Sequence, residues 1–156
     1  CEMVVRFLAI WKNWDRNSKV LNEYKGRMKS FLNLFMNGNK ELSKEVLASW
    51  FSLFNETVNK VVSVYGENAF KRRDLDGTSE KTINRAIMDV IMLSCTQHSF
   101  DDLLLKKEVI NQRFLELMNN VVEFKNSIKI GTSDTKVITY RLSTWCDEVD
   151  RILATN

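Results

Sequence analysis

Residues 47–65, LASWFSLFNETVNKVVSVY, carry the longest helical pattern in the sequence and decide its fold class. Apolar side chains recur there every three or four residues for about five turns, which is the repeat of an α-helix with one apolar face. Ser43 fits the N-cap of this helix, and Gly66 fits its stop. The sequence therefore predicts a long amphipathic helix whose apolar stripe is formed by Leu47, Trp50, Phe51, Phe54, Val58, Val61, Val62 and Tyr65.

The same repeat continues on both sides of this helix. It occurs in residues 7–14, 24–35, 83–95, 110–121 and 138–152. The segment at 83–95 is apolar on more than one side, so we expect it to be the most buried helix. Thr78 or Ser79 is its expected cap, and Ser133 or Asp134 is the expected cap of the last helix.

Together these segments predict an all-α bundle of about six helices, forming a single domain over residues 1–156 without a significant sheet. The polar, glycine-containing stretch at 66–80 is expected to be a loop, and Ser99 and Asp102 are expected to cap a short turn through residues 101–105. The chain has no proline and five glycines, which is too few chain breakers for a turn-rich all-β domain. Its 44% hydrophobic and 28% charged residues exclude a disordered chain.

The charge of the chain is nearly balanced. Twenty-three Lys and Arg against 20 Asp and Glu leave a net charge of +3, which is weaker than the clustered basic face of a typical nucleic-acid-binding domain. No run of 18 apolar residues indicates a membrane span, because even VVRFLAIW is interrupted by Arg6.

The ends and the cysteines suggest a cellular compartment. The start, CEMVVRF, lacks the pattern of a secretory signal, and without an initiator methionine we expect a fragment of a larger protein. Cys1, Cys95 and Cys146 are odd in number and have no metal-ligand spacing. Free thiols in the cytoplasm, packed as small apolar side chains, are the expected state.

The sequence DLDGT, residues 74–78, matches the DxDGT signature of haloacid-dehalogenase-type phosphatases. In those enzymes the two carboxylates lie at the tip of a buried parallel strand beside Mg²⁺. Here the preceding residues are FKRR, and no other strands are predicted to build a sheet. We expect a solvated loop that leads into a capped helix.

Other catalytic and cofactor motifs are missing. His98 is the only histidine and lies in the loop CTQHSF, where we expect it to be solvated rather than catalytic. GxGxxG and GxxxxGK[ST] phosphate loops are absent. The sequence therefore predicts no catalytic residue, no metal site and no cofactor.

Several polar residues lie on otherwise apolar helices. Arg85 and Asp89 are spaced i,i+4 and are expected to pair. Asn84, Arg141 and Thr132 complete the polar set. Because an unpaired buried charge is costly, we expect a structural network that fixes the packing; a contact surface for a neighbouring domain or for nucleic-acid phosphate is the alternative.

The densest basic cluster is formed by Lys71, Arg72 and Arg73. It is a candidate for binding nucleic acid or a partner domain. Simple solvation in the loop is the alternative.

Four short stretches in this order resemble a known family. They are YKGRMKSFLNLFM, GENAFKRRD, KTINRAIMDVIML and IKIGTSDTKVITYRL. They are similar to the C-terminal helical region of ParB/sulfiredoxin-like proteins, the family that includes the GmrSD-type modification-dependent restriction enzymes. The similarity covers residues 24–153 and is carried by Asn68-Ala69-Phe70 with Arg72, by Ile83–Met88, and by Gly131-Thr132-Ser133 with Arg141.

The resemblance implies a helical companion of an NTP-dependent, DNA-targeting protein. The family's DGQQR motif lies on an N-terminal ParB-like domain and does not occur here, and the single histidine and absent proline do not fit the HNH nuclease that often follows. The expected function is a non-catalytic module of a restriction or phage-defence protein that packs against its own N-terminal domain. DNA and a second copy of the chain are candidate partners, and a membrane is not.

Three other functions remain to be separated from this one. The main alternative is a stand-alone helical interaction or regulatory domain, such as an antitoxin-like partner. A secreted four-helix signalling protein is disfavoured by the cysteines and the missing signal, and a phosphatase acting through DLDGT is the least favoured.

Overall fold

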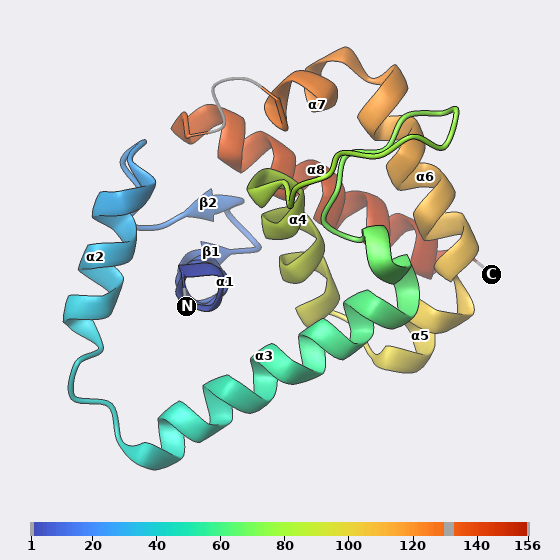
Figure 1. The fold of residues 1–156 in the computed structure, drawn as a ribbon. Coiled ribbons are helices and arrows are strands. Elements are labelled where there is room, and N and C mark those ends of the chain that lie inside the picture. The colour runs from blue at the N-terminus through green and yellow to red at the C-terminus, as the bar shows by residue number, and fades with distance from the viewer. Residues whose placement is uncertain (1, 130–132, 156) are drawn as a thin grey trace.

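The computed structural model describes residues 2–129 and 133–155, and Figure 1 shows them as a bundle of helices. Eight α-helices lie within this part of the chain, which confirms the all-α prediction. None of them combines the length and apolar character needed to cross a bilayer. The elements are α1 (Glu2–Asn13), β1 (Trp14–Asp15), β2 (Val20–Leu21), α2 (Met28–Gly38), α3 (Lys44–Tyr65), the 3-10 turn η1 (Gly66–Asn68), α4 (Arg85–Thr96), α5 (Phe100–Leu105), α6 (Lys107–Asn120), α7 (Val122–Ser127) and α8 (Thr135–Ala154).

The two additional helices are short. α5 and α7 contain six residues each, which is less than two turns and too short for a helical repeat to be recognised. Ser99 caps α5, since its hydroxyl accepts the Asp102 amide at 3.1 Å. The backbone of Val121 is extended and separates α6, which corresponds to the predicted segment at 110–121, from α7, which was not predicted. β1 and β2 form one short antiparallel pair, which takes Trp14 out of the first helix.

α4 is the central helix of the bundle. All residues from Ala86 to Cys95 are buried, and the helix packs against α1, α3 and α8. In Figure 1 it lies between α1 on one side and α8 on the other. The prediction that this is the most buried segment is therefore confirmed.

The start of α4 differs from the prediction. Thr78 and Ser79 do not cap it; Asn84 does, because its side-chain oxygen accepts the amides of Ala86 and Ile87 at 3.0 and 3.2 Å. Ser79 instead forms an antiparallel bridge with Arg73. The helix consequently begins several residues later than its apolar pattern suggests.

The ends of α3 and α8 follow the sequence. Ser43 caps α3 by accepting the Val46 amide, and Gly66 ends this helix with φ of +72°, a conformation that side chains other than glycine rarely adopt. Asp134, one of the two residues predicted for α8, caps that helix by accepting the Lys136 amide at 2.8 Å.

Aromatic side chains fill the interior between α3, α6, α7 and α8. Phe114 is fully buried, and its ring centroid lies 4.5 Å from Trp145, 6.0 Å from Phe124 and 6.1 Å from Tyr65. The tilted and edge-to-face geometries suit aromatic quadrupoles. This cluster fixes the half of the bundle that follows α4.

α3 does not bury the whole stripe that its sequence predicts. Trp50 stacks on Phe35 of α2 at 5.7 Å, and Phe54 lies 5.7 Å from Phe7 of α1. Leu47, Phe51 and Val62, by contrast, are 51%, 61% and 57% exposed. α1 and α2 therefore cover only part of the apolar surface of α3.

Candidate functional site

Three charged side chains meet in the interior. The Asp89 carboxylate on α4 accepts hydrogen bonds from Nε and Nη2 of Arg6 on α1, at 2.7 and 2.6 Å, and from Nη2 of Arg141 on α8 at 3.3 Å. The Asp89 and Arg141 side chains are 0% exposed, and that of Arg6 is 9% exposed. Arg141 also donates to the Ser127 carbonyl of α7 at 3.2 Å. This charged trio (Arg6, Asp89 and Arg141) thus links four helices.

The trio differs from the network that the sequence predicted. Arg85 does not pair with Asp89; its exposed guanidinium lies 3.5 Å from Glu2. Arg85 is the first residue of α4, and its side chain is 60% exposed, whereas that of Asp89 is buried. Thr132, the remaining predicted member, lies outside the described residues.

Sequence reasoning did not assign Arg6 a site. The sequence feature that could have identified it is its place as the only charged residue in the apolar run VVRFLAIW. A charge buried in such a helix needs a partner. Burial alone would lower the pKa of Arg6, but its hydrogen bond to Asp89 and the charge of that carboxylate raise it. Arg6 is therefore a permanent cation inside the fold.

Asn84 connects α4 to the chain before α8. Besides capping α4, its side-chain amide donates to the Ile128 carbonyl at 3.2 Å. The predicted polar residue is thus a structural clamp at the helix start.

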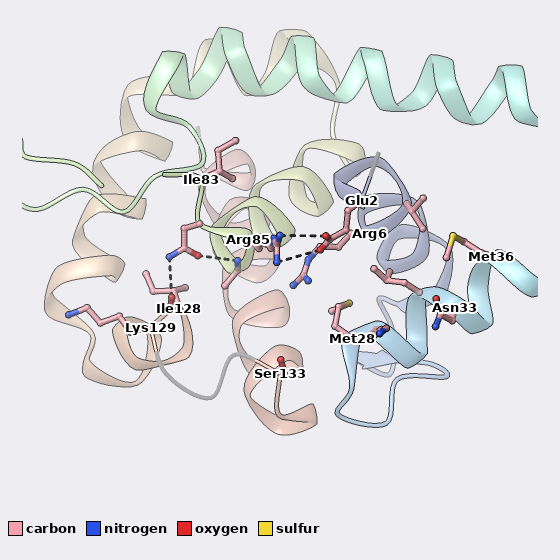
Figure 2. A pocket seen from close by; sticks show the side chains of 15 residues that line it. Glu2, Arg6, Met28, Asn33, Met36, Ile83, Arg85, Ile128, Lys129 and Ser133 are labelled. Carbon is pink, nitrogen blue, oxygen red and sulfur yellow. Dashed lines mark hydrogen bonds and ion pairs between the residues drawn. The ribbon is translucent and has the colours of Figure 1, made fainter. Parts of the chain in front are cut away.

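A cavity of about 1010 Å³ opens beside the trio, between α1, α2, the start of α4 and residues 128–129 (Figure 2). Arg6, Lys29, Arg85 and Lys129 line it, with Glu2 as the one acidic residue among its described lining. Val5, Met28 and Leu32 add apolar surface. An arrangement of this kind attracts anions.

The basic cluster at 71–73 is partly buried, and only Arg72 among its three side chains pairs with a carboxylate. Arg72 lies 3.2 Å from Glu80, and Arg73 donates to Asn111 of α6 at 3.4 Å. Lys71 donates to Asn68 at 3.2 Å. Burial lowers the pKa of the half-buried Arg73. The three side chains therefore have separate partners within the fold.

The DLDGT sequence forms the tip of a surface hairpin. The Asp74 and Thr78 backbones are bonded at 2.9 Å, and the Thr78 hydroxyl donates to Asp76 at 2.8 Å. No parallel strand precedes Asp74 within the described residues. The carboxylates stabilise the turn. The predicted loop is confirmed, but it does not lead directly into a helix, since α4 begins only at Arg85.

His98 is less solvated than the sequence suggested. Its side chain is 14% exposed, with Nε2 lying 2.9 Å from an oxygen of Asp150, which also pairs with Arg16 at 2.5 Å. Burial lowers the pKa of His98, and the charge of Arg16 lowers it further, against the attraction of Asp150. His98 is therefore neutral at neutral pH.

The two described cysteines are buried free thiols. Burial raises the pKa of both Cys95 and Cys146 to about 12, so neither is a thiolate at neutral pH. This confirms that they pack as apolar side chains. Across residues 2–129 and 133–155, no group of three or more His, Cys, Asp or Glu is placed to hold a metal ion.

Part of the apolar stripe of α3 reaches the surface of the molecule. At about 100° per residue, positions 47, 51, 58 and 62 lie within about 60° of one another around the helix. Val58 is partly buried, and Leu47, Phe51 and Val62 are exposed. We call these four residues the α3 apolar stripe. α5, which packs on α3, exposes further apolar side chains at Phe100, Leu104 and Leu105.

Comparison of the chain with protein-family models, with curated proteins and with solved structures finds no match.

Proposed function

We propose that this chain is a non-catalytic helical module that packs against a further domain through the α3 apolar stripe. The carrying observation is the exposure of Leu47, Phe51 and Val62 on the longest helix of the fold. Single exposed apolar residues are common, but aligned ones mark interaction surfaces. In Figure 1 the first half of α3 extends away from the α5–α8 side of the bundle.

Burial of these apolar side chains in an interface would contribute favourable free energy to binding. Burying apolar surface contributes roughly 25 cal/mol per Å², and aromatic side chains are favoured anchors at interfaces. Phe51 is the most exposed member of the stripe and its natural anchor.

The non-catalytic part of the proposal rests on the state of the reactive groups. The thiols of Cys95 and Cys146 are protonated, His98 is held against Asp150, and the DLDGT carboxylates cap a surface turn.

The partner is proposed from the resemblance of residues 24–153 to the ParB/sulfiredoxin-like family. In this proposal the module belongs to a cytoplasmic, DNA-targeting protein of the restriction or phage-defence type. Its partner is a ParB-like N-terminal domain of the same protein. The proposal assigns DNA contact and dimerisation to that whole protein.

The test is to express the complete gene product as two polypeptides, one of them this chain, and to follow complex formation by size-exclusion chromatography. We expect a one-to-one complex that Phe51→Asp disrupts. The matched control is Val122→Asp, which changes a 71% exposed residue on α7 and should leave the complex intact. A gene without a ParB-like domain, or a complex that tolerates Phe51→Asp, contradicts the proposal.

The same experiment addresses the alternative of a stand-alone interaction domain, which the same exposed stripe favours. A gene that encodes this chain alone would support that alternative. The stripe would then be expected to bind a separate protein.

A further inference from the structure

The cavity between α1, α2 and α4 has the dimensions of a ligand site. Its volume of about 1010 Å³ is at the upper end of the roughly 300–1,000 Å³ of small-molecule pockets. Among its described lining residues, four are basic (Arg6, Lys29, Arg85 and Lys129) and one is acidic (Glu2). The cavity therefore carries a positive potential.

The charged trio lies behind the cavity, and its one member in the cavity lining, Arg6, is already counted among the four basic residues. Arg6 and Arg141 share the single carboxylate of Asp89, so the trio has a net charge of +1 in the interior. Burial lowers the pKa of Arg141, and the positive charge of Arg6 lowers it further. The opposite charges of the buried Asp89 and Arg141 cancel, so the positive charge of the cavity comes from its lining residues.

Arg6 is oriented for such an anion. Asp89 holds its Nε and Nη2 atoms and leaves Nη1 unengaged by that carboxylate. Figure 2 shows the Arg6 guanidinium directed into the space between α1, α2 and the start of α4. Because Asp89 fixes the guanidinium, little further ordering is needed when a ligand binds.

The anion would be held by side chains rather than by the amides at the start of α4. Asn84 already accepts the Ala86 and Ile87 amides. Arg85 is 60% exposed and paired with Glu2 only at 3.5 Å, so it is able to turn toward a ligand. Arginine is well suited to phosphate oxygens, to which it offers several donors in one plane.

We propose that this cavity binds a small anionic ligand carrying a phosphate group, up to the size of a nucleotide. Arg6 and Arg85 contact the phosphate, Lys29 and Lys129 supply charge at the rim, and Glu2 competes for Arg85. This site lies apart from the α3 apolar stripe and does not depend on the proposed packing function.

The test is calorimetric titration of the whole chain at low ionic strength with three probes: inorganic phosphate, ADP and adenosine. We expect phosphate or ADP to bind and adenosine not to bind. Equal affinities for phosphate and ADP identify the free anion as the ligand, and tighter ADP binding identifies a nucleotide. Affinity should fall as salt rises, because the attraction is electrostatic.

Charge variants at the rim give opposite expected effects. The triple change Lys29→Gln, Lys129→Gln and Arg85→Gln should weaken binding about tenfold, since exposed charge contacts contribute roughly 0.2–1 kcal/mol each. Glu2→Gln should tighten binding about threefold by releasing Arg85. The matched controls are Lys107→Gln and Glu108→Gln at the start of α6, which should change nothing.

Each outcome decides the proposal. The proposal is overturned if neither phosphate nor ADP binds at about 10 mM while circular dichroism shows that the chain is folded. Adenosine binding as tight as ADP binding, or a triple variant that binds like the parent, overturns it too. Opposite shifts in the triple variant and in Glu2→Gln support it, whatever the partner of the α3 apolar stripe proves to be.

Discussion

Asp89 on α4 accepts two hydrogen bonds from the guanidinium of Arg6 on α1, at 2.7 and 2.6 Å, although the two residues are 83 positions apart. The pair is buried, and it couples the first helix to the central one. A second guanidinium, from Arg141, shares the same carboxylate.

Replacing Asp89 by asparagine should destabilise the protein by about 3–5 kcal/mol, because it removes the buried carboxylate charge that two guanidinium groups share. Chemical denaturation measures the loss. Arg85→Gln is the control and should cost no more than about 0.5 kcal/mol, since Arg85 forms only a surface pair with Glu2. Equal losses for both variants would show that Asp89 is not the hub of the trio.

The helices could be predicted from the sequence, but the partner of Asp89 could not. The three- and four-residue repeat identifies α3 and α4, and Ser43 and Gly66 mark the ends of α3. The sequence predicted Arg85 as partner because i,i+4 pairs are the contacts that a single helix defines. Arg6 approaches Asp89 only after two helices have packed, which a local pattern does not encode.

The exposure of the α3 apolar stripe could not be predicted from the sequence either. α3 has apolar residues on two adjoining faces, and only packing decides that Trp50 and Phe54 are covered while Leu47 and Phe51 are not. The cavity combines α1, α2, α4 and residues 128–129, so its basic lining has no local sequence pattern either.

Asn84→Ala should destabilise the protein by about 1–2 kcal/mol. The change removes the cap of α4 and the hydrogen bond to the Ile128 carbonyl. Ser43→Ala removes only a cap, on exposed α3, and should cost less. Thermal unfolding of the two variants measures the difference; a larger loss for Ser43→Ala would argue against the clamp role of Asn84.

Stability should fall as the pH drops below about 7 through the titration of His98. Because burial lowers the pKa of His98 in the folded state, the unfolded chain takes up the proton first, so acidification favours unfolding until the folded form also titrates. The stabilising contribution is fully present above the ordinary histidine pKa of about 6.5. Denaturation curves at several pH values should show a shallower pH dependence for His98→Gln, and an unchanged dependence would exclude His98 as the source.

Cys95 and Cys146 should resist alkylation in the native protein. Burial raises the pKa of both thiols to about 12, so at pH 8 almost no thiolate is present and the reagent has no access. In a Cys1→Ser background, which leaves only these two thiols, labelling monitored by mass spectrometry should proceed at the rate of unfolding. Fast labelling under native conditions would contradict their burial.

Hydroxyl-radical footprinting of Phe51 tests the proposed packing most directly, because it reports the exposure of that side chain. In the isolated chain Phe51 should be oxidised readily, and in the complete gene product its oxidation should slow severalfold while that of Val122 stays constant. Equal oxidation of Phe51 in both forms would contradict the proposal that the α3 apolar stripe packs against another domain.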